Sequence, residues 1–550
     1  MRSPFRVIEE DSPEQTTKLR APSLRLLSVA RVGNHECQSV LKGHDFSRAE
    51  IRAKHERALA PEGRISSLWF LALVAPLFLT ACKPVGPDYN RPAYHAPDIY
   101  KETGAPSIVP PPNPTGGSWN AANPSDGMLR GNWWEVFGDP QLNKLEERIA
   151  TDNQALRQAM ENYRAARDQV AEVRSTLFPT LSAGPSFTHN QVSQHRASFS
   201  VGAKTSYNDL VLGGQGTWEP DFWGGIRRNV EAARANAQAS AAEMANVNLS
   251  LQAEIAADYF QLRGLDSQIK LLKSTAGDLE HQLDLTQRRL KGGVATAADV
   301  EQAETQLQTV RAQLVDVSVG RAQFEHAVGT IANYSLPDFS IPFSPLDLPL
   351  PKVPTGVPSQ LLERRPDIAL QERQAAAANA RIGVAISAYY PTISLSGTGG
   401  FESTHGGTWI QGPSAFWSLG AQAAQLLFDA GRRHALTDQA RAQFEAQSAA
   451  YRNTVIQAFQ DVEDNLSTLR ILDQERAVEA QAVSAAQRSF NVSNQRYKGG
   501  VTGYLEVLTA EATLLANQRT LTDLETRQFA ATVQLIRALG GGWDTSQLPK

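Results

Sequence analysis

The sequence contains almost no cysteine. Two in 550 residues, Cys37 and Cys82, cannot build a disulfide framework or a cysteine-based metal site. Basic residues are not in excess either: 53 Lys and Arg stand against 57 Asp and Glu, and this balance argues against a nucleic-acid partner. An apolar fraction of 41% with a mean hydropathy of −0.33 excludes both a polytopic helical membrane protein and a disordered chain.

Residue patterns for chemistry are also missing. The ten His are scattered, and no metal-ligand spacing, nucleophile elbow or phosphate loop occurs. We therefore expect no enzymatic activity, no metal site and no cofactor. A chain of 550 residues is too long for one compact core, so two or more units are predicted.

The first apolar run lies inside the chain. Residues 1–63 show no sustained periodicity and are predicted to be a disordered extension or to precede the true start. Residues 64–81 join a basic residue, an apolar stretch and small residues, the pattern of a secretory signal. The ending Leu-Thr-Ala-Cys is similar to the bacterial lipobox, which predicts a covalent lipid on Cys82. The alternative is a buried apolar segment with a chance cysteine. Lys83 next to it is compatible with the outer membrane.

A short motif occurs twice. Residues 289–294 read Arg-Leu-Lys-Gly-Gly-Val and residues 496–501 read Arg-Tyr-Lys-Gly-Gly-Val, 207 residues apart (496 − 289). Asp299 and Glu506 follow the two copies at the same spacing. A glycine pair that interrupts a long helical pattern is typical of a helix end. The two motifs therefore predict the tips of two long helical hairpins in a duplicated chain.

The flanks of the motifs repeat the same order of elements. Each half reads as a helix, two strands, a long helix, a tip and a return helix; in the first half these are a helix over 141–177, strands within 180–222 and a long helix over 226–290. The predicted units are an extended segment over 82–140, a first repeat over 141–336, a Pro-rich connector over 337–360, a second repeat over 361–543 and a tail over 544–550.

The long helix of the first half carries a heptad pattern, which predicts packing against other helices along its length. Its positions are Leu262, Leu265, Ile269, Leu272, Ala276, Leu279, Leu283 and Leu290. The aromatic Trp218 and Trp223 close the strand region, where a membrane interface is expected.

Four strands are too few to close a membrane barrel, because open sheet edges are not tolerated in lipid. Closure requires several chains, and three chains supply twelve strands. The residues therefore predict an α+β membrane protein in which several chains share one β-barrel and the long helices form a tube.

Further motifs carry a family resemblance. They are Cys82 with its lipobox, Trp133-Trp134, the string Leu-Leu-Glu-Arg-Arg-Pro-Asp-Ile over 361–368, Tyr390-Pro391, both tips, and Leu-Gly-Gly-Gly-Trp over 539–543. Together they resemble the TolC-like outer membrane factor family, in its NodT-type lipoprotein branch, from Cys82 to Trp543.

The resemblance implies a homotrimer in the bacterial outer membrane: a trimeric twelve-stranded β-barrel, four strands per chain, continued by a long α-helical periplasmic barrel. It further implies docking to a periplasmic adaptor and an inner-membrane pump. It also implies export of small toxic compounds, or type I-like secretion, through a gated periplasmic tunnel. The competing interpretation is a structural coiled-coil lipoprotein that tethers the outer membrane to the periplasm. The sequence names neither the cargo nor the pump.

The resemblance places the gate at the second tip. Leu505 matches an apolar constriction, Glu506 an acidic ring, and Tyr497 with Asp299 a hydrogen-bonded link between hairpins. Thr509 and Thr502 replace an Asp and an Arg that some members use. The alternative for Glu506 is a solvated helix residue.

The tip residues match adaptor-docking grooves in the same family. These residues are Gly292, Gly293, Val294, Gly499, Gly500 and Val501. A purely structural role in the two turns is the alternative.

Overall fold

The computed structural model describes residues 83–94, 96–97, 100–103, 131–195, 204–354 and 361–549. The predicted extension over 1–63, the predicted signal over 64–81 and Cys82 lie outside these residues. No helix in the described ranges is both long enough and apolar enough to span a membrane.

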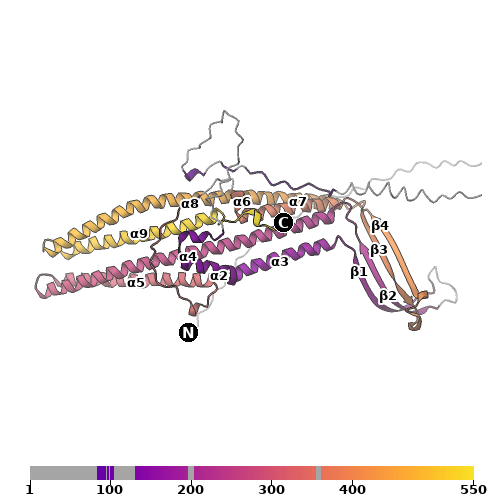
Figure 1. Ribbon diagram of the computed structural model, residues 1–550, viewed down its shortest axis with the longest axis horizontal. Coiled ribbons are helices and arrows are strands. Elements are labelled where there is room, and N and C mark those ends of the chain that lie inside the picture. Colours follow the sequence, from indigo (N-terminus) through magenta and orange to yellow (C-terminus); the bar gives the residue numbers. More distant parts are fainter. Residues whose placement is uncertain are drawn as a thin grey trace, which may run out of the picture. The chain divides into compact units, whose positions relative to one another are not determined.

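Both halves contain the predicted hairpins and strands (Figure 1). The first half comprises α2 (Pro140–Asp152), α3 (Gln154–Ser175), β1 (Thr180–Gln191), β2 (Ser206–Trp218), α4 (Gly225–Lys291) and α5 (Ala297–Ile331). The second comprises α6 (Leu361–Arg364), α7 (Pro366–Ser387), β3 (Thr392–Ser403), β4 (Ala415–Ala424), α8 (Arg432–Lys498) and α9 (Tyr504–Ala538). α4 and α8 each have 67 residues, and α5 and α9 each have 35.

The prediction of one continuous helix over 141–177 is wrong. The segment is divided at Asn153, whose extended backbone (φ −68°, ψ 126°) ends α2 and begins α3. The Asn153 side chain accepts a hydrogen bond from the backbone N–H of Leu156 (3.0 Å) and donates one to Ile331 O (2.7 Å). An Asn side chain that caps a new helix competes with continuation of the old one.

The heptad pattern of α4 is used over most of its length. Leu262, Ile269, Leu272, Ala276 and Leu279 are buried, whereas Leu290 next to the tip is exposed. Four of these, from Ile269 to Leu279, pack with Leu307, Val310 and Val317 of α5 and Leu515 of α9, whereas Leu262 belongs to the aromatic core. The heptad positions therefore join α4 to α5, the other helix of its hairpin, and to α9 of the second hairpin.

Aromatic side chains form the centre of the main core. Phe137 of η3 (Trp133–Phe137) lies 4.7 Å from Phe260 of α4, ring centroid to ring centroid, and Phe260 lies 4.9 Å from Phe529 of α9. Trp133 beside them is buried and donates to Gln252 (3.3 Å). Burial of rings of this size supplies much of the energy of a core, and here it holds three elements from distant parts of the chain together.

The Arg-Arg-Pro-Asp string starts α7 and links it to the second hairpin. Pro366 takes the first helical position, where its missing N–H costs nothing. The Arg365 guanidinium contacts Asp367 (2.6 Å) and Asp461 of α8 (3.1 Å), and donates to Ala538 O (3.2 Å) at the end of α9. This motif thus joins three helices of the second repeat.

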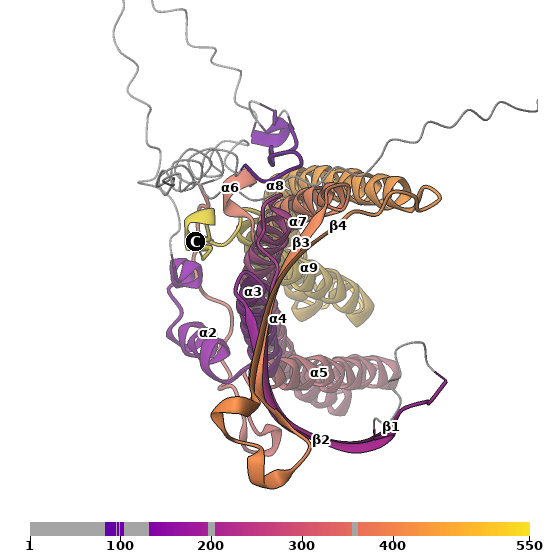
Figure 2. The same ribbon diagram turned by 90° about the vertical axis from the view of Figure 1, so that its right-hand side faces the viewer.

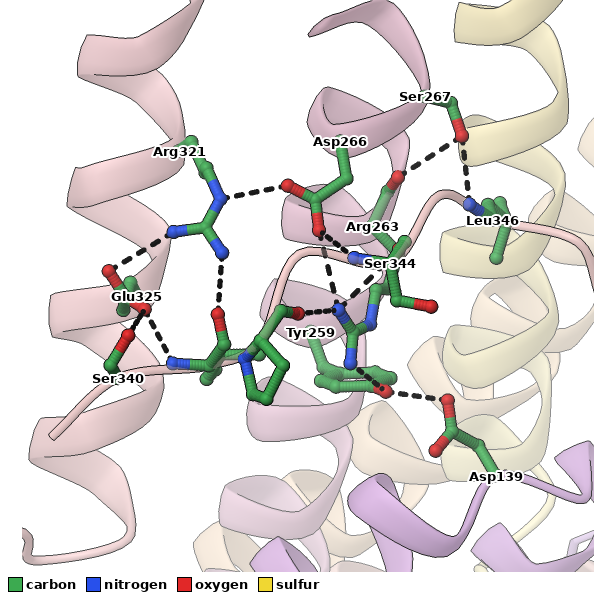
Figure 3. Close-up of polar contacts among 12 residues, drawn as sticks. Asp139, Tyr259, Arg263, Asp266, Ser267, Arg321, Glu325, Ser340, Ser344 and Leu346 are labelled. Atoms are coloured by element: carbon green, nitrogen blue, oxygen red, sulfur yellow. Dashed lines mark hydrogen bonds and ion pairs between the residues drawn. The ribbon is translucent and has the colours of Figure 1, made fainter. Parts of the chain in front are cut away.

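A buried charge network attaches the Pro-rich connector to the first hairpin (Figure 3). Asp266 of α4 is fully buried and accepts from Arg321 of α5 (2.8 Å), from Arg263 (3.3 Å) and from the backbone N–H of Ser344 (3.0 Å). Arg263 also donates to Pro342 O (2.6 Å). Two guanidinium groups and a backbone amide satisfy the carboxylate, as burial of a charge requires.

Candidate channel wall and gate

The four strands form one antiparallel sheet in the order β1-β2-β3-β4. The pairing of β2 with β3, from Leu210 opposite Ser403 to Trp218 opposite Leu395, joins the two halves of the chain. Figure 2 shows the sheet as a single curved layer. Within the described residues, β1 and β4 have no partner strand on their outer sides.

The sheet has one apolar face. Residues paired across antiparallel strands share a face, and the register places large apolar side chains on the same side of all four strands. This group comprises Leu181, Phe187, Leu210, Leu212, Leu395, Phe401, Trp417 and Leu419. Leu181, Phe187, Trp417 and Leu419 are exposed. Large exposed side chains on a continuous face mark a surface that another apolar medium covers.

The opposite face is mainly polar. Ser182 pairs with Gln215, Gln215 with Thr398, and Thr398 with Ser418, so hydroxyls and an amide cross the whole sheet. Val211 and Phe416 are among its apolar exceptions. This alternation of apolar and polar sides is the pattern of a wall between lipid and water.

The Trp residues at the strand ends bind the helix ends. Trp218 donates from Nε1 to Leu177 O (2.9 Å), and Trp223 donates to Pro391 O (2.7 Å) and stacks on Tyr390 (4.9 Å between centroids). The Tyr390-Pro391 motif is thus one half of a hydrogen-bonded corner where helix changes to strand.

The two tips have the same backbone geometry. Gly293 and Gly500 are left-handed, with φ of 73° and 72°. The N–H of Val294 donates to Arg289 O (2.8 Å), and the N–H of Val501 donates to Arg496 O (2.9 Å). These are the six-residue closing bonds of a Schellman motif, and they require the left-handed residue that Gly provides most readily.

The helices that leave the tips differ in their caps. Before α5, Thr296 and Asp299 form a capping box, with the Thr296 N–H 2.8 Å from the Asp299 carboxylate. The equivalent residue before α9 is Gly503, which has no hydroxyl and makes no side-chain cap. Glu506, the counterpart of Asp299, is exposed, and its carboxylate makes no hydrogen bond or ion pair with another described residue. The Glu506 carboxylate of the second tip is therefore free, whereas the Asp299 carboxylate of the first tip is part of a capping box.

The predicted hydrogen bond between Tyr497 and Asp299 is wrong for this structure. The Tyr497 hydroxyl is buried without a hydrogen-bond partner among the described residues, and Asp299 is held by its capping box. The hairpins are linked at Tyr497 by another residue of the first motif. Arg289 donates from Nη1 to Tyr497 O (3.2 Å), and its guanidinium lies 4.4 Å from the centre of the Tyr497 ring.

A second link between the hairpins lies further from the tips. Gln282 of α4 accepts from the Tyr504 hydroxyl (3.2 Å) and donates to Glu511 of α9 (3.2 Å). The Tyr497 and Tyr504 rings lie 5.2 Å apart and close a small core with Ala303 and Val507. Our sequence analysis missed Arg289, Gln282 and Glu511 as linking residues. The only sequence signal was an Arg in one tip motif and a Tyr in the other.

Apolar side chains of both tips are exposed. Val294 and Val501 have 68% and 70% of their surface accessible, and Leu505, next to Glu506, has 62%. Candidate docking and constriction residues therefore lie on the surface of the single chain, at one end of each hairpin.

A sheet with one apolar and one polar face, continued by long paired helices whose tips are closed by glycines, is the architecture of an envelope channel protein. The outer membrane efflux protein family matches residues 146–333 and 357–541 of this chain. The chain is similar to the pyoverdine export outer membrane protein OpmQ of Pseudomonas aeruginosa, at 31% identity over 432 residues, 78% of this chain and 90% of OpmQ. It is also 31% identical over 412 residues to the toluene efflux pump outer membrane protein TtgC of Pseudomonas putida, 75% of this chain and 85% of that protein.

The fold agrees with these sequence matches. The outer-membrane channel OprN superimposes with a TM-score of 0.74 and 28% identity, over 84% of this chain and 99% of OprN. The chain belongs to the outer membrane efflux protein family. It is the outer-membrane channel component of an efflux system. The predicted family and function are thus confirmed.

Proposed function

We propose that three copies of this chain form the channel, each supplying four strands of a closed twelve-stranded wall and one third of a helical periplasmic tunnel. The observation that carries this proposal is the one-sided sheet, whose apolar face is exposed and whose outer strands β1 and β4 have no neighbour among the described residues. Edge groups left unpaired in lipid cost several kcal/mol each. Pairing of β4 with β1 of the next chain removes them.

The trimer passes small toxic compounds from an inner-membrane pump to the exterior. OpmQ and TtgC are named for two different cargoes, pyoverdine and toluene, so similarity to them does not single out one compound. A covalent lipid on Cys82 adds a membrane anchor; its support is the Leu-Thr-Ala-Cys ending of residues 79–82.

The proposed gate is the second tip. Three Leu505 side chains form an apolar constriction and three Glu506 carboxylates an acidic ring beside it. One support is the exposure of Leu505. The other is the free Glu506 carboxylate: because the N-cap residue is Gly503, which has no hydroxyl, Glu506 takes part in no capping box. A ring of carboxylates favours cations. Tyr497 holds the closed state through Arg289, while Asp299 stabilises the first tip.

Glu506→Gln is expected to lower the cation preference of the reconstituted channel several-fold, because three negative charges leave the mouth. The reversal potential across a salt gradient in a planar bilayer measures this preference. Glu304→Gln, an exposed carboxylate of α5 outside the ring, is the matched control and is expected to change nothing. An unchanged reversal potential in Glu506→Gln would exclude the acidic ring.

The proposed adaptor-docking surface comprises the exposed valines Val294 and Val501 with the tip glycines Gly292, Gly293, Gly499 and Gly500. The equal geometry of the two tips supports it, because three chains then present six similar apolar surfaces. A partner with a repeated complementary surface fits such an array.

Val294→Glu with Val501→Glu is expected to reduce capture of the adaptor about tenfold or more, since burial of two new charges opposes docking. Crosslinking in membranes followed by co-purification measures the loss. Val315→Glu on α5, with the same exposure of 69%, serves as the control. Equal loss in the control, or none in the double variant, would contradict docking at the tips.

A further inference from the structure

A cavity lies between the two hairpins, about one and a half to three and a half turns of α9 beyond the proposed gate. Its volume is about 370 Å³, and its walls come from α4, α8 and α9. The residues that matter here are Asp278 and Gln282 of α4, Phe490 and Asn494 of α8, and Glu511 and Leu514 of α9. A cavity of this size holds a small organic molecule.

Glu511 is the unusual group in this cavity. Its side chain is 5% exposed; Oε1 accepts from Gln282 (3.2 Å), and Oε2 has no hydrogen-bond partner among the described residues. Buried carboxylate oxygens are normally paired, and an unpaired one is costly in a low-dielectric environment. One oxygen of a buried acid is thus left for a group that enters the cavity.

The cavity is negative. Asp278 lies on the α4 wall, and the Tyr504 hydroxyl on α9 meets the same Gln282. Burial raises the pKa of Tyr504, so this hydroxyl stays neutral. From α8 the lining residues are Gln487, Phe490 and Asn494, none of them charged. No Lys, Arg or His is among the described residues that line the cavity, so neither carboxylate has a cation there.

The apolar lining residues of the cavity favour an organic cation. Phe490, Leu514 and Leu515 give the cavity an aromatic and aliphatic side. An ammonium group is stabilised by carboxylates and by an aromatic face, and its hydrocarbon part by leucines. Amides such as Asn494 can accept the further N–H donors.

We propose that this cavity binds a small protonated organic amine, with its ammonium group on Glu511 and Asp278 and its hydrocarbon part against Phe490 and Leu514. Because the walls belong to both hairpins, an occupant holds the hairpins together. That consequence for opening depends on the gate proposed above, whereas the binding site itself does not.

Protonation of Glu511 competes with the amine. Burial raises the pKa of the Glu511 carboxyl to about 7 and the charge of Asp278 adds to the rise, while the hydrogen bond from Gln282 opposes it. The ionised fraction of such a group increases about tenfold from pH 6 to pH 8. An amine that is protonated at both pH values is therefore expected to bind about tenfold more tightly at pH 8.

The test is calorimetric titration of the full-length protein in detergent with 2-phenylethylamine. One saturable site per chain is expected, tighter at pH 8 than at pH 6 by about tenfold, with at least a tenfold loss in Glu511→Gln. Asp284→Asn is the matched control, because Asp284 is an exposed α4 carboxylate paired with Arg288 outside the cavity. It is expected to bind as the unmodified chain does.

A neutral analogue tests the need for the ammonium charge on the unmodified protein, and so does not depend on folding of the Glu511 variant. The alcohol 2-phenylethanol has the same ring without the charge and is expected not to bind. Equal binding of the alcohol, no saturable binding of the amine, or unchanged binding in Glu511→Gln would each overturn the proposal. Binding of Mg²⁺ alone with the same pH profile would assign the carboxylates to a metal and also overturn it.

Discussion

Arg289→Ala is expected to raise the open probability of the reconstituted channel about tenfold to thirtyfold. Arg289 reaches from the first tip to the second, where it donates to Tyr497 O and lies over the Tyr497 ring. A charge-assisted hydrogen bond with a cation–π contact at a half-buried site is worth about 1.5–2 kcal/mol. If the contact exists only in the closed state, its loss shifts the equilibrium by that amount. Single-channel recording in a planar bilayer measures the open probability.

The neighbouring arginine supplies the control for this prediction. Arg288 is largely exposed and pairs with Asp284 on its own helix (2.7 Å), so Arg288→Ala removes a like charge from the same tip without a link between hairpins. Its open probability is expected to stay at the unmodified value. Equal opening in the two variants would show that charge at the tip, not the contact with Tyr497, sets the gate.

Asp266→Ala is expected to destabilise the periplasmic part by about 3–5 kcal/mol. The change removes a carboxylate that Arg263 and Arg321 share in a buried network, and breaking such a network leaves charges uncompensated. The backbone N–H of Ser344 loses its acceptor at the same time. Hydrogen exchange of the connector around Ser344, together with the denaturant midpoint, measures the effect.

The comparison for Asp266 is an exposed ion pair on the same hairpin. Glu280 and Arg311 lie 2.6 Å apart across α4 and α5, and both are well exposed. Glu280→Gln is expected to cost less than about 1 kcal/mol, because solvent screens such pairs. Comparable losses in the two variants, with the Ser344 amide still protected, would contradict the role of the buried network.

Local and repeated signals in the sequence predicted much of the fold. The Gly292-Gly293 and Gly499-Gly500 pairs located both tips, since a left-handed glycine closes a helix through its immediate neighbours. The absence of proline over 225–336 predicted one long helix up to the first tip, which is α4. The break at Asn153 was missed because an Asn inside a helical pattern becomes a cap only when the backbone turns there.

The side-chain contacts between the two hairpins could not be predicted from the sequence. Tyr497 was paired with Asp299 by resemblance, but Thr296 provides Asp299 with a local partner three residues away. Arg289, Gln282 and Glu511 meet residues more than 200 positions distant, and no local pattern encodes such a distance. The site thus depends on the register of α4 against α9, which the heptad positions indicate only to the nearest turn.

The number of chains in the native particle tests the central claim most directly. Native mass spectrometry of the protein extracted from membranes in detergent is expected to give a mass of three chains, because only neighbouring copies can pair the edges of β1 and β4 and cover the sheet. A particle of one chain, with β1–β4 intact, would contradict the account.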